Sequence, residues 1–291
     1  MKATQVGRLF VYVLIFLGLV MAGLAWKYST SISERISFED LNGNAKNGEY
    51  VLRMAGCVAC HTRIDDGGEL LAGGAAIDSP FGTFYAPNIT PNKQHGIGGW
   101  SLSDFNHALT QGISPSGEHY FPAFPYTSYH RLAPQDIADL KAYLETVPEV
   151  SNPSQSHQLN WPFSVRRLVG AWKALFFKQG KVTFKSRGAY LVNGPGHCAE
   201  CHSPRNVLGG INHSLALQGS QRGPEGKPVP AIMGEKADIK NWPKEDIILY
   251  LQTGITPEGD TVGGAMAEVI YESTSYLSDE DVAAMVDYLL Q

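Results

Sequence analysis

The sequence predicts a mainly α-helical fold, in which two related modules follow one another after an N-terminal transmembrane helix. Three observations lead to this prediction: an uncharged run near the N-terminus, a cysteine motif that occurs twice, and matching segments at a near-constant offset of 141–145 residues. The 291 residues, 43% of them hydrophobic, suffice for two cores. The formal net charge of −5 provides no basic excess for a phosphate backbone, so we expect no nucleic-acid partner.

The N-terminal run extends from Leu9 to Trp26, between Arg8 and Lys27. Its 18 uncharged residues favour a membrane span, because a span needs roughly 17–25 residues and the apolar core of a removable signal peptide only about 7–15. Basic residues before the run would keep the N-terminus in the cytoplasm. We therefore assign residues 1–30 to an anchor in membrane lipid. Cleavage after Ala25 is the alternative, and the remaining chain is exported in both cases.

The repeat is centred on the cysteine motif, which reads Cys-Val-Ala-Cys-His at 57–61 and Cys-Ala-Glu-Cys-His at 198–202. These two copies contain all four cysteines of the chain. Each module is predicted to close with an amphipathic helix, at 134–146 and at 278–290. Residues 31–147 and 188–291 are thus predicted to be homologous modules, and at an offset of 142 the following residues of the first recur in the second: Trp100, Asp104, Leu109, Gly112, Ile113, Pro115 and Gly117.

A basic connector is predicted at residues 148–187. Its net charge is +6, whereas the two modules carry −6 and −8. Within it, an apolar stripe at helical spacing indicates an amphipathic helix with Arg166, Arg167 and Lys173 on the other face. The simpler interpretation is that the stripe packs on the modules and the charges are solvated. Contact with a membrane surface or with haem propionates is the alternative.

The chemistry of the modules lies in the repeated motif. Cysteines three positions apart project from one face of a helix, so both sulfurs can form thioethers with one porphyrin. The histidine that follows then lies beside the macrocycle and can bind its iron. We therefore predict two covalently bound c-type haems, held by Cys57 and Cys60 and by Cys198 and Cys201, with His61 and His202 as axial iron ligands.

Two other uses of paired cysteines fit less well. Structural zinc would need four converging ligands, and the histidine after each pair would have no role in such a site. A thioredoxin-type redox pair would require a βαβ context that neither copy has. Thioether attachment of haem also agrees with export, since it is completed outside the cytoplasm.

The sixth iron ligand differs between the two modules. A methionine usually completes an electron-carrying c-type centre, and Met266 lies in a loop of small residues, 263–267, that would allow close approach to a haem. Met233 is the other nearby candidate, and Met285 belongs to the core stripe of the closing helix. The offset of 142 aligns Met266 with Phe124, which cannot bind iron.

The first module therefore needs another sixth ligand or has none. Its methionine, Met54, precedes Cys57 by three residues and should point into the helix packing. His119 and His130 flank the Phe124 position and are the candidates, although each taken alone resembles a surface histidine. Three further histidines are expected to have structural roles: His95, His107 and His157.

Four segments carry a resemblance to a known family: Ala-Pro-Asn-Ile-Thr-Pro at 86–91, Gly-Ile-Gly-Gly-Trp-Ser at 96–101, Tyr-Phe-Pro-Ala-Phe-Pro-Tyr at 120–126 and Cys-His-Ser-Pro-Arg-Asn at 201–206. With them the chain resembles the cytochrome c subunits of membrane-bound periplasmic dehydrogenases, which oxidise alcohols, gluconate, sorbitol and aldehydes. Many members have three haem motifs, whereas this chain has two. The family's methionine in the Pro-Ala-x-Pro-Tyr loop is Phe124 here.

The resemblance implies a subunit that accepts electrons from a catalytic partner and passes them to a quinone or an oxidase. Together with the motifs, it predicts two tandem class I-like cytochrome c domains on the periplasmic side of the bacterial inner membrane. We expect an electron carrier without substrate chemistry of its own. The alternatives are a haem enzyme, such as a dihaem peroxidase with open iron in the first module, and a gas or redox sensor, although no signalling domain follows the modules.

Overall fold

The computed structural model describes residues 41–291 except 65, 181, 224 and 225, together with residues 8, 11–13, 15, 16 and 18. Most of the predicted anchor at 1–30 lies outside these residues. In the part of the chain that is described, no helix is both long and apolar enough to cross a bilayer.

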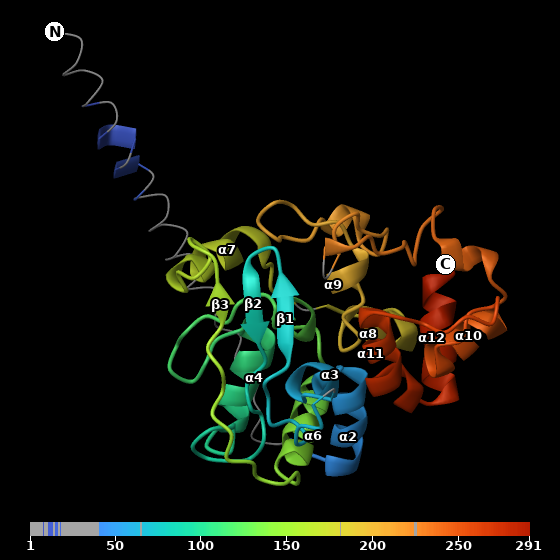
Figure 1. Cartoon of the computed structure of the whole chain (residues 1–291), viewed down its shortest axis with the longest axis horizontal. Helices are drawn as coiled ribbons and strands as arrows, with labels where there is room; N and C mark the ends of the chain where they lie inside the picture. Colours follow the sequence, from blue (N-terminus) through green and yellow to red (C-terminus); the bar gives the residue numbers. More distant parts are fainter. Residues whose placement is uncertain are drawn as a thin grey trace.

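The described fold is mainly helical, as expected (Figure 1). Its α-helices are α2 (Ala45–Met54), α3 (Cys57–His61), α4 (Leu102–Gln111), α5 (Tyr126–Tyr129), α6 (Pro134–Leu144), α7 (Arg167–Phe176), α8 (Arg187–Asn193), α9 (Ala199–His202), α10 (Lys244–Thr253), α11 (Ala265–Glu272) and α12 (Asp279–Leu289). The 3-10 helices are η1 (His213–Leu215), η3 (Asp238–Asn241) and η4 (Thr274–Tyr276), and the strands are β1 (Ala76–Ser79), β2 (Gly82–Tyr85) and β3 (Gln158–Leu159).

Each half of the repeat packs its first helix on its closing helix, α2 on α6 and α8 on α12. Glycine allows both crossings to be close. A side chain at Gly48 would come within 1.9 Å of the carbonyl oxygen of Asp139, and one at Gly188 within 1.8 Å of that of Ala284. Met54 is buried, as predicted, and Met285 lies in the core of the second half. The two halves that repeat in the sequence therefore also pack their first and closing helices in the same way.

The closing helices begin within one residue of their predicted starts. Pro134 occupies the first turn of α6, and Ser278 caps α12 by accepting a hydrogen bond from the backbone of Asp281. A capping box would also turn the Asp281 carboxylate back to the cap. That carboxylate instead accepts hydrogen bonds from Arg187, at 2.6 Å, and from Tyr50, at 2.7 Å.

A small antiparallel sheet, in the order β1-β2-β3, was not predicted. The strands β1 and β2 form a hairpin in which Ser79 pairs with Gly82, and the connector adds β3 by pairing Leu159 with Gly82. Strands of two to four residues are too short to give a clear alternating pattern in the sequence. The sheet fixes the start of the connector to the first module.

The two modules join through a reciprocal contact. Tyr50 donates to Asp281 and accepts a hydrogen bond from the backbone N–H of Ser278, at 3.2 Å. At the matching place, Tyr190 donates to Asp136 and accepts from the backbone N–H of Ala133, also at 3.2 Å. The same surface is thus used on both sides, as in a symmetric dimer. Buried residues of both modules belong to one continuous core.

The connector helix α7 is oriented differently from the simpler interpretation, which is wrong in part. Lys173 is fully buried, whereas Leu168 and Leu175 are 49% and 54% exposed. The Lys173 ammonium group donates to the carbonyl oxygens of Gln111 and Gly112, at the C-terminal end of α4, where helix carbonyls lack intrahelical donors. It also lies 4.4 Å above the ring of Tyr126. Because Lys173 caps the C-terminal end of α4, the face of α7 that carries Lys173 packs inward and the face with the two leucines is exposed.

Candidate haem sites

Both cysteine motifs lie on short helices that are reached through a left-handed residue. Gly56 has a φ of 63° immediately before α3, and His197 has a φ of 41° immediately before Cys198. The preceding helices, α2 and α8, are anchored in the core by residues such as Val51 and Leu191, which are at most 1% exposed. The sharp turn therefore sets the direction in which each motif leaves a rigid helix.

The two motif histidines are oriented in the same way. His61 Nδ1 lies 2.7 Å from the carbonyl oxygen of Pro87, and His202 Nδ1 lies 2.8 Å from that of Pro230. A carbonyl only accepts, so each Nδ1 carries the proton and Nε2 keeps its lone pair. Burial lowers the pKa of both histidines. Each is thus a neutral, oriented imidazole, which is the form that binds a metal.

The segments that follow the motifs repeat an uncommon backbone. Leu71 and Leu217, both fully buried, have φ values of 60° and 63°, a region that side-chain-bearing residues rarely adopt. Each donates its backbone N–H to a hydroxyl directly after its motif, that of Thr62 or of Ser203, at 3.0 Å. The two sites therefore share the same local backbone, including a leucine in a strained conformation.

The cysteines do not resemble a redox pair or a zinc site. Burial raises the pKa of Cys57 and of Cys198 to about 12, whereas a reactive pair needs a lowered thiol pKa. Among the residues that the structure describes, no three histidine, cysteine or acidic side chains converge as metal ligands. The oriented histidine directly after each cysteine pair agrees with the thioether-linked haem that the motif predicts.

The two motifs lie close to each other. A Cβ atom at Gly56, directly before the first motif, would lie 3.5 Å from the ring of His197, which directly precedes the second motif. The helix α11, which carries Glu268, packs against α3 (Figure 1). The first motif therefore contacts the second module as well as its own.

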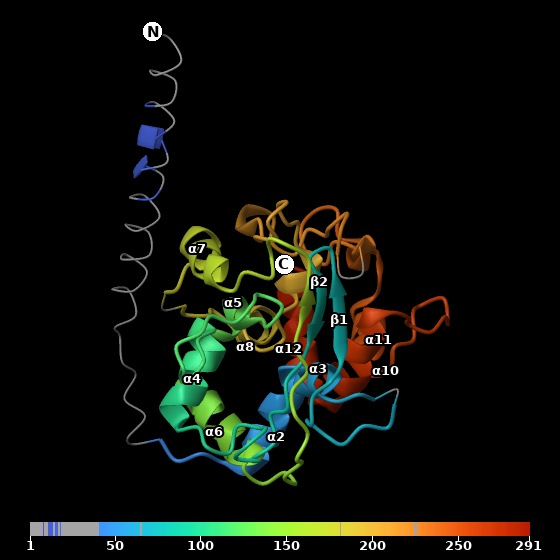
Figure 2. The same ribbon diagram turned by 60° about the vertical axis from the view of Figure 1, so that its left-hand side comes forward.

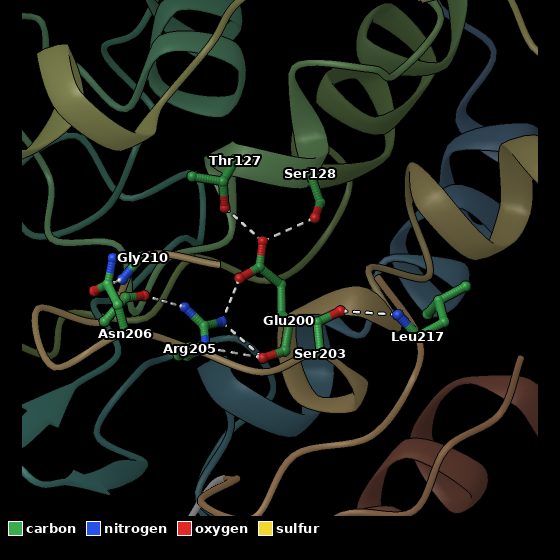
Figure 3. A network of polar contacts seen from close by, with 9 residues as sticks. Thr127, Ser128, Glu200, Ser203, Arg205, Asn206, Gly210 and Leu217 are labelled. Atoms are coloured by element: carbon green, nitrogen blue, oxygen red, sulfur yellow. Dashed lines mark hydrogen bonds and ion pairs between the residues drawn. The ribbon is translucent and has the colours of Figure 1, made fainter. Parts of the chain in front are cut away.

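Glu200, inside the second motif, makes a polar link between the modules (Figure 3). Its buried carboxylate accepts hydrogen bonds from Thr127 and Ser128 of α5 and pairs with Arg205 at 2.6 Å. Burial alone would raise its pKa, but Arg205 and these hydroxyl groups lower it on balance. The matching residue of the first motif is Ala59. A charge at this position in only one of two otherwise similar motifs is the sequence signal for this link.

Met266 is partly buried against the core, in the first turn of α11. The sequence predicted a loop here, but α11 already begins at Ala265, after Gly264 with a φ of 62°. Phe124, its counterpart, packs against the ring of Tyr129, with 5.7 Å between centroids. Tyr129 in turn donates to the carbonyl oxygen of Ala55, two residues before Cys57.

His119 and His130 both contact the connector. His119 Nδ1 lies 3.2 Å from the ammonium group of Lys173, and the ring of His130 packs edge-on against Phe177. Burial lowers the pKa of His130 to about 4. These contacts give both side chains a structural role, and iron binding by either stays a prediction. His157, expected to be structural, accepts a hydrogen bond from the backbone of Tyr85.

Comparison with known proteins identifies the family. Residues 45–148 match the family model described as cytochrome c. The chain is 44% identical to a protein of Cereibacter sphaeroides described as "Diheme cytochrome c-type", over 92% of each chain. The chain belongs to the dihaem c-type cytochromes. It is therefore an electron carrier with two c-type haems, which confirms the cofactors predicted from the motifs.

Relatives of this dihaem cytochrome include subunits of larger assemblies. It is 42% identical to the fructose dehydrogenase cytochrome subunit of Gluconobacter japonicus and 37% identical to the cytochrome c subunit of the alcohol dehydrogenase (quinone) of Gluconobacter oxydans. Each match covers 83–84% of this chain and 51–54% of the relative. The chain thus spans about half the length of these two relatives. The resemblance to cytochrome subunits of membrane-bound dehydrogenases is confirmed.

Proposed function

We propose that this dihaem cytochrome relays electrons from the catalytic subunit of a periplasmic dehydrogenase to a quinone or a terminal oxidase. The observation that carries the proposal is the closeness of the two motifs through Gly56 and His197, because short separation favours transfer between two centres. The names of the relatives supply the kind of partner. The architecture proposed is two tandem class I-like cytochrome c domains, held at the inner membrane by the anchor at residues 1–30.

When bound, each haem supplies reversible one-electron chemistry at its iron. We assign Cys57 and Cys60 to one thioether pair and Cys198 and Cys201 to the other. His61 and His202 would each supply a ring nitrogen to the iron, and the carbonyl groups of Pro87 and Pro230 orient the two rings through Nδ1. Cys57 and Cys198 pack against the core, which would shield that side of each haem from water and favour a high potential.

For the sixth position we propose Met266 in the second module. Its partly buried place at the start of α11, after a stretch in which Gly263 and Gly264 have open space, supports this assignment. For the first module the candidates are His130 and His119. Burial keeps the imidazole of His130 neutral at pH 7, as iron binding requires.

Carbon monoxide tests the carrier against the peroxidase alternative. It is added to the reduced holoprotein, and the spectrum of each haem is followed. A closed carrier leaves both spectra unchanged, whereas rapid binding at one haem would support the enzyme. Magnetic spectroscopy of His130→Ala and His119→Ala then identifies the first-module ligand. An unchanged low-spin signal in both variants would exclude both histidines.

The partner is tested in membranes. Deletion of the gene should abolish oxygen uptake driven by one of the alcohol, sugar or sugar-acid substrates of such dehydrogenases, and restoring the chain should recover it. Variants that lack a motif histidine, His61→Ala or His202→Ala, should not restore uptake. Unchanged uptake on every substrate after deletion would contradict the proposed role.

A further inference from the structure

The connector exposes large apolar side chains on one side. Trp161 is 83% exposed, and Leu168 and Leu175 are 49% and 54% exposed. Seven residues separate the two leucines, so they lie on the same face of α7. Hydrogen bonds from Ser164 to Asn160 and from Leu168 to Val165 make the segment before α7 a continuous series of turns, which keeps Trp161 next to the helix.

The second module extends this apolar surface. Val207 and Leu208 are 89% and 47% exposed, and the indole N–H of Trp172 on α7 donates to the carbonyl oxygen of Leu208 at 2.7 Å. We call the whole surface the connector face, and Figure 2 shows α7 at the outer edge of the fold. It consists of Trp161, Phe163, Leu168, Leu175, Val207 and Leu208.

Charge separates the connector face from the rest of the molecule. Residues 150–199 contain no acidic residue and seven lysines and arginines. Arg167, the first residue of α7, and Lys178, two residues after its end, are exposed. The two modules carry −6 and −8 and would be repelled by an anionic surface. The connector is thus the part of the chain that can approach one.

We propose that the connector face docks on the surface of an anionic phospholipid bilayer. Exposed tryptophan and leucine side chains beside solvated cations are the composition that inserts at the boundary between headgroups and acyl chains. An anionic bilayer matches both the charge of the connector and the apolar side chains of Trp161 and Leu168, whereas an acidic module of another copy would protect them equally with and without anionic lipid. Docking goes beyond electron relay, and it fixes which side of the modules faces the membrane.

The test measures how fast a single introduced cysteine reacts with an uncharged polyethylene-glycol maleimide. The native cysteines are consumed in thioethers, so the full-length holoprotein suffices. Leu168→Cys and Val207→Cys report on the connector face. Leu249→Cys is the matched control, because Leu249 is 44% exposed on α10, at the other end of the molecule from α7 (Figure 1). Each is placed in nanodiscs of phosphatidylcholine alone or with phosphatidylglycerol.

Both connector cysteines should react at least about tenfold more slowly with phosphatidylglycerol present, and the control equally fast in both discs. Adding Arg167→Glu and Lys178→Glu should restore fast labelling, since each cation near an anionic surface contributes about fivefold to binding. Equal rates in both discs overturn the proposal. Protection that is the same in detergent, which would mean cover by another segment of the chain, overturns it too. Slow labelling of the connector cysteines that appears only when a dehydrogenase subunit is present also overturns the proposal.

Discussion

The phenol of Tyr50, in the first module, donates a hydrogen bond of 2.7 Å to the carboxylate of Asp281, in the second. The repeat provides the same pair in the opposite sense, from Tyr190 to Asp136. In both pairs the tyrosine belongs to the helix that leads to a haem motif, and the aspartate belongs to the first turn of the other module's closing helix. The modules therefore hold each other at a fixed distance and angle.

Removing both phenol groups should loosen this contact. For Tyr50→Phe combined with Tyr190→Phe, we expect the free energy of unfolding to fall by about 3–6 kcal/mol, because each hydrogen bond to a charged group contributes about 1.5–3 kcal/mol. Denaturant unfolding of the holoprotein measures it. Tyr271→Phe, at an exposed tyrosine, should change stability by less than about 0.5 kcal/mol. Equal stability of the double variant and the control would show that the contact does not hold the modules.

Two acidic residues should tune the two haems separately. Glu200 lies within the second motif, and Glu268 lies on α11, which packs against the helix of the first motif, α3. A negative charge stabilises the oxidised iron, so Glu200→Gln should raise the potential of the second haem and Glu268→Gln that of the first. Redox titration of each variant, with the two haems resolved spectroscopically, measures the shifts. The larger shift should follow Glu200, because it is buried and Glu268 is exposed. Shifts of the same haem in both variants would contradict this assignment.

Loss of the Met266 sulfur should alter the second haem. We expect Met266→Ala to lose the sulfur-to-iron charge-transfer band and to lower the potential, since an axial methionine raises it. Met233→Ala is the control, because Met233 is also partly buried against the core. Retention of the band in Met266→Ala and its loss in Met233→Ala would transfer the ligand role to Met233.

Lys173 should make stability depend on alkaline pH. Burial lowers its pKa from 10.5 to about 7, so between these values the unfolded chain binds a proton that the folded chain does not. The free energy of unfolding contributed by this group therefore rises as pH increases from about 7 to 10.5, and it is constant below pH 7. Lys173→Met should lose that rise, which thermal or denaturant unfolding at pH 7 and pH 9 measures. His119 and Tyr126 face the ammonium group, and burial and the charge of Lys173 lower the pKa of His119, so this histidine titrates below the pH range compared. An equal rise in both would exclude Lys173 as its source.

Local patterns predicted much of this structure from the sequence. The motifs, the offset between the modules and the closing helices depend on spacing along the chain, and the structure reproduces the helices to within about two residues. Gly48 and Gly188 stand at matching places before the two motifs. In the structure, both allow the same close crossing with the closing helix.

Other features depend on contacts between distant segments. Lys173 reads as a solvated residue on an amphipathic helix, and only the free carbonyls at the end of α4 explain its burial. The hydroxyl partners of Glu200 come from α5, more than seventy residues earlier in the chain. The histidines near Phe124 were chosen by sequence proximity, whereas the connector determines where their rings lie.

The crossed tyrosine contacts limit how such a chain can be recombined. Because Tyr50 needs the aspartate of the other half and Tyr190 needs that of the first, exchanging one half for that of a relative would break both contacts unless the donor supplies a tyrosine and an aspartate at the same places. Halves of two relatives should therefore combine only where both carry the tyrosine and the aspartate at these places. A chimaera joined at the connector would be stable only if both contacts can form between its two halves.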